Sequence, residues 1–198
     1  MNLRIGIDIG STTVKVVVLD EQNNLLFRSY ERHFSKVREK TCEILERIKD
    51  KLLGHQVRMV ITGSAGLGVS KASGIDFVQE VYATAAAVDT FIPGTDAVIE
   101  LGGEDAKIIY FRGGLEERMN GVCAGGTGSF IDQMASLLQT DATGLNTYAK
   151  DYKAIYPIAA RCGVFAKSDI QPLINEGATR EDLSASIFQA VVNQTISG

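Results

Sequence analysis

Cysteine and histidine are scarce in this sequence, and the few present do not fall at familiar metal-binding spacings. The cysteines are Cys42, Cys123 and Cys162. None belongs to a C-x-x-C pair, which argues against a single-chain zinc or redox motif. An odd cysteine count behind an N-terminus that does not resemble a signal peptide fits a reducing cytoplasm better than a disulfide framework. The two histidines, His33 and His55, have no partner at ligand spacing, so both are expected to face solvent.

Long apolar runs and basic clusters are also missing. No apolar run approaches the ~18 residues that a membrane-spanning helix needs, so no membrane span is expected. Lysine and arginine are spread along a chain of net charge −4, so no nucleic-acid partner is expected either. Hydrophobic residues make up 45% of the sequence, which is enough to bury a substantial core. These features predict a globular, cytoplasmic protein.

Hydrophobic periodicity predicts an α/β fold along the whole chain. Strands are expected at residues 3–9, 14–19, 25–30, 57–62, 97–101, 106–111, 115–119 and 155–160. Helices are expected at residues 36–53, 82–89, 127–138, 164–176 and 180–196. Cys42 lies in the apolar stripe of the first of these helices and is expected to be buried in the core. The Pro93-Gly94-Thr95 turn predicts a boundary between two lobes, 1–94 and 95–198.

The strand pattern restarts near residue 97 as an internal repeat. The segment IDIGSTTVKVVV at 7–18 matches IELGGEDAKIIY at 99–110, and each copy runs strand, acidic residue, glycine turn, strand. Asp8 aligns with Glu100, Gly10 with Gly102, and Lys15 with Lys107. Repeats within a chain usually reflect duplicated architecture. The sequence therefore predicts two related α/β lobes that face each other, each presenting a hairpin turn to a cleft.

The turns of the repeat carry groups suited to phosphate. Glycine lets backbone N–H groups approach phosphate oxygens closely, and hydroxyls and lysine add further donors. A third glycine-rich run leads into a predicted helix, another common anion-binding arrangement. Together the three turns predict binding of ATP or a similar phosphoester. The candidate nucleotide contacts are Gly10, Ser11, Thr12, Thr13, Lys15, Gly102, Gly103, Gly126, Thr127 and Gly128.

Carboxylates stand at the ends of the repeated strands. They are Asp8, Glu100 and Asp105. Hard oxygen ligands of this kind suit Mg²⁺, which keeps several waters and also binds nucleotide phosphates. Asp8 and Asp105 are therefore expected to hold Mg²⁺ through water, and one carboxylate is expected to orient an attacking water.

The segments GIDIGSTTVK, ELGGEDAK and CAGGTG together resemble the superfamily of acetate kinases, sugar kinases, actin and heat-shock chaperone ATPases. That resemblance implies duplicated ribonuclease H-like lobes around a nucleotide cleft, the actin-like ATPase fold. It also implies catalytic roles for Asp8, Glu104 and Asp105. Glu104 stands where the smaller ATPase activators of this superfamily usually have glutamine.

Two segments narrow the resemblance. Cys123 in NGVCAGGTGSFIDQMA and Cys162 in RCGVFAKSDIQPLINEG resemble the cluster ligands of the activators of 2-hydroxyacyl-CoA dehydratases, the CoA-substrate-specific enzyme activases. The resemblance implies a homodimer that holds one 4Fe–4S cluster, with two cysteines from each subunit. Ferredoxin or flavodoxin would reduce the cluster. ATP hydrolysis would then drive a low-potential electron into a 2-hydroxyacyl-CoA dehydratase or a benzoyl-CoA reductase-like enzyme.

The cysteines themselves are compatible with that reading. A 4Fe–4S cluster typically needs four thiolates, and two-fold symmetry doubles two cysteines to four. Cys123 and Cys162 each precede a predicted helix, whose N-terminus favours a thiolate and an anionic cluster. Backbone N–H groups of Ala124, Gly125 and Gly163 are candidate donors to cluster sulfurs. The charges of Arg161 and Lys167 either face solvent or hold the cluster.

Alternatives remain open at this point. The cysteine segments look most like those of long, multi-domain activases, of which this chain would be the N-terminal part. The glycine-rich strand-turn that holds adenosine in the family has no counterpart before Gly198, so the second lobe is expected to be incomplete. A small-molecule or acid kinase of the same superfamily, without a cluster, is the first alternative. A nucleotide-binding regulatory module of a larger protein is the second.

Overall fold

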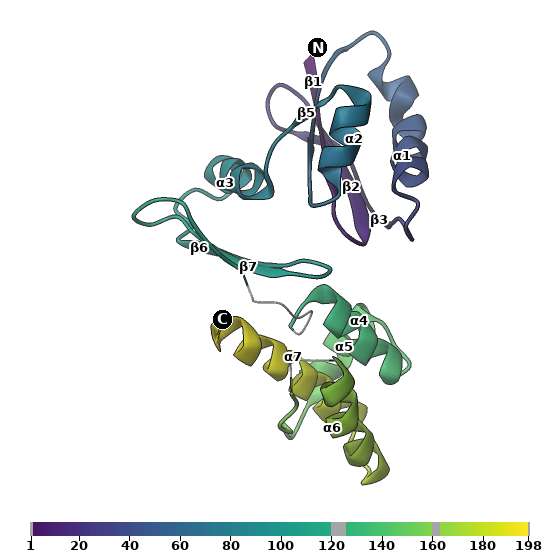
Figure 1. The fold of residues 1–198 in the computed structure, drawn as a ribbon, viewed down its shortest axis with the longest axis vertical. Helices are drawn as coiled ribbons and strands as arrows, with labels where there is room; N and C mark the ends of the chain where they lie inside the picture. Colours follow the sequence, from purple (N-terminus) through teal and green to yellow (C-terminus); the bar gives the residue numbers. More distant parts are fainter. Residues whose placement is uncertain (1, 120–125, 160–162, 198) are drawn as a thin grey trace. The chain divides into compact units, whose positions relative to one another are not determined.

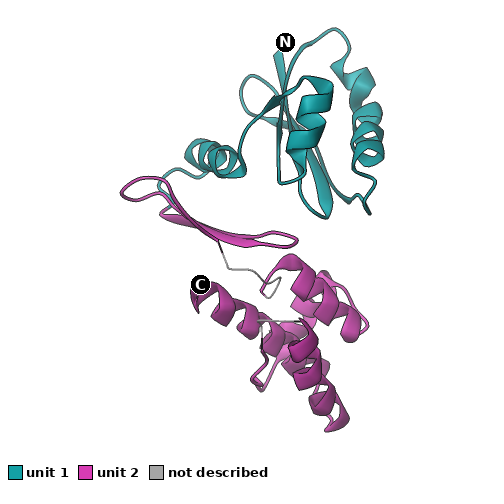
Figure 2. Cartoon of the chain, in the orientation of Figure 1, with its two compact units in different colours: residues 1–95 teal, residues 96–198 magenta. Residues whose placement is uncertain are grey.

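The computed structural model describes residues 2–119, 126–159 and 163–197 (Figure 1). The predictions made for Cys123, Ala124, Gly125, Arg161 and Cys162 lie outside the described residues. The chain divides into two compact units, residues 1–95 and 96–198 (Figure 2).

The first unit is built on a five-stranded sheet. Strands β1 (Asn2–Ile9), β2 (Thr13–Leu19) and β3 (Leu25–Arg32) form an antiparallel meander. Strands β4 (Gln56–Thr62) and β5 (Asp76–Phe77) join it in parallel, giving the order β3-β2-β1-β4-β5. Side chains alternate between the two faces of a strand, so every second residue of β1 points the same way. Those residues are apolar and form the core of the unit, with Leu3, Ile5, Ile7 and Ile9 all buried.

Three helices complete the first unit: α1 (Val37–Leu52), α2 (Gly66–Ser73) and α3 (Glu80–Phe91). Residues of α1 and α2 pack on the core face of the sheet. Residues of α3 line the opposite face. The short helix α2 and strand β5 are not predicted from the sequence.

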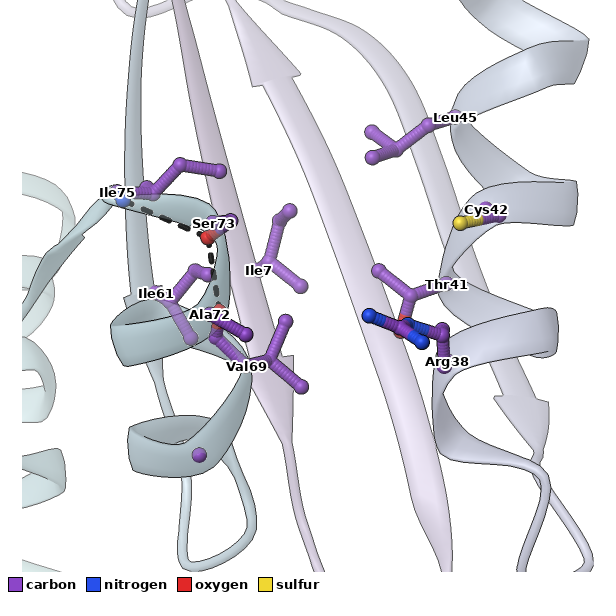
Figure 3. Close-up of a pocket in the computed structure, with 11 residues that line it drawn as sticks. Ile7, Arg38, Thr41, Cys42, Leu45, Ile61, Val69, Ala72, Ser73 and Ile75 are labelled. Carbon is purple, nitrogen blue, oxygen red and sulfur yellow. Dashed lines mark hydrogen bonds between the residues drawn. The ribbon is translucent and has the colours of Figure 1, made fainter.

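The prediction that Cys42 lies in the core is wrong. The residues that α1 buries are Thr41, Ile44 and Ile48, spaced along one narrow stripe, and Cys42 falls beside it and is exposed. Cys42 lines a largely apolar pocket of about 330 Å³ between α1 and α2 (Figure 3). The stripe is narrower than the sequence suggests because two helices share this face of the sheet.

Ion pairs fasten α1 to strand β3. Glu31 accepts hydrogen bonds from Ser29, Arg47 and Lys40, and Lys40 also pairs with Glu43 at 2.7 Å. The Ser29 hydroxyl, followed by the Arg47 guanidinium, lowers the pKa of Glu31 to about 2. The carboxylate is therefore stabilised in its charged form in the folded protein.

The second unit begins with a smaller sheet and continues as helices. Strands β6 (Ala97–Leu101), β7 (Ala106–Tyr110) and β8 (Glu116–Met119) are antiparallel in that order. They are followed by α4 (Gly128–Leu137), α5 (Ala142–Tyr148), a 3-10 turn (Ala149–Asp151), α6 (Gly163–Asn175) and α7 (Arg180–Ser197). The helices share a core that includes Phe130, Met134, Leu145, Ile170, Leu183 and Ile187.

The strand predicted at 155–160 is wrong over its described part, 155–159, which has no regular secondary structure and pairs with no described strand. Helix α7 holds the chain here through side chains. Asp182 Oδ1 accepts the N–H groups of Lys153 and Ala154 at 2.6 and 2.8 Å, and Ser186 Oγ accepts that of Tyr156 at 2.8 Å. The two backbone donors keep the pKa of Asp182 below its usual value.

Candidate functional site

The first repeated turn connects β1 to β2. The Gly10 N–H donates to the carbonyl of Thr13 at 3.0 Å and closes the turn. Ser11 and Thr12 are half-buried, and Thr13 is buried. Gly10 does not have a positive φ, and a Cβ there would meet only ordinary contacts at 3.8–4.0 Å. Neither backbone strain nor crowding therefore explains why residue 10 is a glycine. A glycine here is consistent with a backbone that is left open to an approaching ligand.

A lysine and a carboxylate lie side by side at this turn. Asp8 and Lys15 are cross-strand neighbours, and Lys15 Nζ lies 2.7 Å from Asp8 Oδ2. Within the described part of the chain, Asp8 Oδ1 is buried and has no hydrogen-bond partner. The same holds for Oγ1 of Thr62, which pairs with Asp8 on the neighbouring strand β4. Buried polar atoms are nearly always satisfied, so these two oxygens mark a place where a polar ligand or an ion fits.

A largely apolar pocket lies beside these residues in the first unit. The pocket has a volume of about 480 Å³ and includes Asp8, Lys15 and Thr62 in its lining. The remaining lining is mostly apolar and comes from the sheet and from α3, for example Val60 and Ala86. The sequence singles out Asp8 and Lys15, but it gives no signal for Thr62, because only the parallel pairing of β1 with β4 brings it there.

The second repeated turn connects β6 to β7 and is more tightly constrained. A Cβ on Gly102 would overlap the Asp105 carboxylate and lie 3.1 Å from the backbone oxygen of Asp105, so a side chain there would displace that carboxylate. Asp105 Oδ2 lies 3.2 Å from Lys107 Nζ, and the Lys107 side chain is only 5% exposed. Glu104, at the tip, is exposed, and Gly103 is half-buried. The turn thus holds one carboxylate in place and leaves another facing solvent.

Helix α4 is anchored on this second turn. The N–H groups of Gly128 and Ser129 donate to the carbonyls of Gly102 and Gly103, at 2.8 and 3.0 Å. A Cβ on Gly128 would lie 2.9 Å from the Gly102 carbonyl oxygen, so the close approach needs glycine. Thr127, at the N-cap, is fully buried. The N–H of Gly128 is therefore used inside the protein.

Gly126, the first residue of the predicted GTG contact, meets α7. It has φ 78° and a Cβ there would lie 2.9 Å from Cγ of Gln194. The run Gly126-Thr127-Gly128 thus lies between the turn of the small sheet and the last helix. The structure brings this run together with Gly102 and Gly103, as their shared hydrogen bonds show.

The described residues that follow the two candidate cluster cysteines belong to helices in contact, α4 and α6. Gly163 begins α6, and a Cβ there would overlap Oε1 of Gln133 on α4. Gln133, Gly163 and Lys167 line a shared pocket of about 560 Å³. Among the described ranges, which leave out Cys123 and Cys162, no group of three or more His, Cys, Asp or Glu residues could hold a metal ion.

The two histidines differ from each other. His55 is exposed, as predicted, but the same prediction for His33 is wrong. His33 is 5% exposed, and its Nε2 lies 3.1 Å from the carbonyl oxygen of Gly10. The partner lies far away in sequence, so hydrophobic periodicity gives no sign of it.

No helix in the described part of the chain is long and apolar enough to span a membrane.

Comparison with known proteins gives consistent matches over most of the chain. A curated relative, the 2-hydroxyisocaproyl-CoA dehydratase activator of Clostridioides difficile, is 30% identical over 97% of this chain and 73% of its own length. A solved structure of the activator of the 2-hydroxyisocaproyl-CoA dehydratase from Clostridium difficile, with bound ADPNP, has a TM-score of 0.87 at 29% identity. It is matched over 98% of this chain and 74% of that one.

A second solved structure, component A of (R)-2-hydroxyglutaryl-CoA dehydratase from Acidaminococcus fermentans, has a TM-score of 0.85 at 25% identity. The match covers all of this chain and 77% of that one. These similarities confirm the predicted α/β class and actin-like ATPase fold. The model of the BadF/BadG/BcrA/BcrD ATPase family matches residues 5–197. The chain therefore belongs to the BadF/BadG/BcrA/BcrD ATPase family.

Proposed function

We propose that this protein is an ATP-dependent activator that passes a low-potential electron to a 2-hydroxyacyl-CoA dehydratase or a benzoyl-CoA reductase-like enzyme. The observation that carries the proposal lies beside the first turn, where Asp8 has a buried oxygen with no partner among the described residues, next to Lys15. It occurs in a chain similar along nearly its whole length to a dehydratase activator. The ADPNP in the related solved structure supports a nucleotide as the ligand.

The first turn supplies the phosphate contacts in this proposal. Backbone N–H groups and the hydroxyls of Ser11, Thr12 and Thr13 donate to phosphate oxygens. Lys15 adds positive charge and at the same time holds Asp8 by its other oxygen. The free Oδ1 of Asp8 fits a water of a Mg²⁺ ion, because Mg²⁺ usually keeps several waters when it binds nucleotides. Asp8 and Mg²⁺ together would orient the phosphate for hydrolysis.

The second turn supplies the other half of the nucleotide site. Gly102 and Gly103 offer backbone to phosphate, and Asp105, oriented by Lys107, takes the role of holding a water or a Mg²⁺-bound water. Glu104 is exposed at the tip of this turn and is assigned to positioning the attacking water. Both carboxylates lie on a turn whose conformation is fixed by the glycines described above.

The run Gly126-Thr127-Gly128 couples nucleotide to the rest of the second unit. Because the N–H groups of Gly128 and Ser129, at the start of α4, bond to the second turn, a change in that turn on ATP binding displaces the start of α4. The same run follows Cys123 directly in the sequence. ATP biases such a displacement only by binding its two end states with different affinity.

Cys123 and Cys162 are assigned as this subunit's ligands to a 4Fe–4S cluster shared between two copies of the chain. The contact between α4 and α6, which follow these cysteines, supports bringing them together. Lys167 places a positive charge on the pocket that α4 and α6 share. When bound, the cluster supplies one-electron chemistry at low potential. Ferredoxin or flavodoxin is the proposed donor.

The decisive experiment is an anaerobic preparation of the intact protein, assayed for iron, sulfide and ATPase activity. We expect a brown dimer with about four iron atoms per two subunits. Cys123→Ala and Cys162→Ala should each remove the iron. Cys42→Ala is the matched control and should retain it, because Cys42 lies in the first unit, where it is exposed at the pocket between α1 and α2.

Two outcomes would overturn the proposal. A colourless protein with phosphotransfer to a small molecule would identify a kinase. Nucleotide binding without turnover or iron would identify a regulatory module. Full iron content in either the Cys123 or the Cys162 variant would remove that residue from the ligand set.

A further inference from the structure

His33 is a buried polar side chain that the proposed function leaves unused. It follows strand β3 and is 5% exposed. Two of its groups contact the first phosphate turn. Its Nε2 lies 3.1 Å from the carbonyl oxygen of Gly10, and its backbone N–H donates to the carbonyl of Thr12 at 3.1 Å. One residue is therefore bonded to both ends of the Gly10–Thr12 turn.

The hydrogen bonds define which ring nitrogen carries the proton. The N–H of Ser35 donates to Nδ1 of His33 at 3.1 Å, so Nδ1 is the acceptor and has no proton. Nε2 then carries the proton of the neutral ring and donates it to Gly10. The assignment follows from the hydrogen-bond network. Both ring nitrogens are satisfied only in this neutral tautomer.

The bonds to His33 fix the direction of two peptide planes. In a trans peptide, the carbonyl and the N–H of the next residue point in opposite directions. Holding the Gly10 carbonyl toward His33 therefore directs the N–H of Ser11 away from it. Holding the Thr12 carbonyl does the same for the N–H of Thr13. These are N–H groups that the proposed function assigns to phosphate.

The loop after His33 is shaped to present the ring. Phe34 and Ser35 have φ 46° and 62°, the left-handed region that non-glycine residues rarely occupy. The carbonyl of His33 accepts the N–H of Lys36 at 2.7 Å, just before α1 begins. Two successive residues in this region cost conformational energy, which the bonds made by His33 offset.

We infer that His33 is a positioning residue that orients the Ser11 and Thr13 N–H groups toward the phosphates of the nucleotide. The inference rests on the proposed function, since it needs the first turn to bind phosphate. It adds a residue from a distant segment to that site. It also makes the junction between β3 and α1 part of the nucleotide site.

Two variants test the inference. His33→Leu keeps most of the buried volume but removes both ring hydrogen bonds, whereas His33→Gln restores a donor near the position of Nε2. We expect His33→Leu to weaken nucleotide binding about tenfold, the effect of one lost hydrogen bond, and His33→Gln to recover most of that loss. His55→Gln is the matched control at an exposed histidine and should bind like the parent.

Amide hydrogen exchange without nucleotide supplies an independent readout. In His33→Leu, exchange should accelerate about tenfold at Ser35, whose N–H loses its acceptor, and at Gly10, whose N–H closes the turn, while the strand amides of β1 remain protected. Unchanged affinity and unchanged exchange in a folded His33→Leu protein would overturn the inference. So would equal losses in the Leu and Gln variants. If the parent bound no nucleotide although exchange still accelerated, the proposed function would fail while the support of the turn by His33 would stand.

Discussion

The two repeated hairpins share a sequence pattern but bury opposite faces. In the first, Ile7 is 1% exposed and Val17 is 38% exposed. At the matching positions of the second, Ile99 is 58% exposed and Ile109 is 0% exposed. The alternation is the same in both, so the difference comes from which face the rest of each unit covers. A duplicated strand pattern therefore predicts the hairpin but not the direction of its core.

The turns of the two hairpins also differ in the contacts that hold them. The first is held by a side chain, His33, and its glycine has free space around it. The second is held by the backbone of α4, and its glycine is confined by Asp105. The lysines follow the burial of their faces. Lys15 is 34% exposed, whereas Lys107 is 5% exposed. In the proposed function, the first turn therefore receives the ligand and the second transmits a displacement.

The largest expected effect is on stability, from the two lysines. Lys107→Met leaves Asp105 without its close cation and should cost about 2 kcal/mol of unfolding free energy. That is below the ~3–5 kcal/mol of a fully buried pair, because Asp105 is partly exposed. Lys15→Met should cost less than about 1 kcal/mol, since both partners are partly exposed, but should weaken ATP binding. Urea unfolding followed by circular dichroism measures both. Equal losses of stability would contradict the contrast in burial.

The next largest effect is a difference in stability between alanine substitutions at Gly102 and Gly10. Gly102→Ala should cost about 1 kcal/mol, because the new methyl group overlaps the Asp105 carboxylate and displaces it from Lys107. Gly10→Ala should leave stability within about 0.5 kcal/mol of the parent and reduce nucleotide affinity. Thermal unfolding and nucleotide titration of both variants provide the measurement. A Gly10→Ala protein that unfolds as easily as Gly102→Ala would show that the first turn is also confined.

The smallest effect is a dependence on pH that belongs to the first unit. Hydrogen bonds lower the pKa of Glu31 from 4.5 to about 2 in the folded protein. A lowered pKa means that its contribution is complete above about pH 4.5 and is lost as the pH falls toward about 2. Glu31→Gln should therefore flatten the acid dependence of the unfolding midpoint in this window. Asp182 in the second unit, whose pKa is also lowered, remains in both proteins. Parallel curves for the parent and the variant would contradict this role of Glu31.

Local sequence patterns account for most strands and helices and for the repeated turns. They miss α2 because GLGVSKAS is short and has two glycines, one of which is needed where a Cβ would lie 2.9 Å from Cγ2 of Ile61. They also miss α5, although Asp141 caps it by accepting the N–H of Gly144. Both contacts lie within a few residues along the chain, but neither element has the length or the apolar periodicity that marks a helix in the sequence.

The other failures involve distant partners. Residues 155–159 have the composition of a strand, but their neighbours in space are Asp182 and Ser186, which satisfy nearby backbone N–H groups without a ladder. His33 is polar and isolated in sequence, but it is buried because Gly10 offers it an acceptor. Asp8 and Lys15 could be identified because they belong to the repeat. Thr62 could not, since only the strand register brings it beside Asp8.

Strand β6 combines two features described separately above. It is the edge of its sheet among the described strands, and it carries the exposed side chains Ile99 and Leu101. The edge of a sheet presents unpaired backbone N–H and C=O groups, so an exposed apolar edge strand readily pairs with another extended chain. Concentrated solutions of this chain are therefore expected to associate first through β6, the same hairpin that presents Gly102 and Asp105.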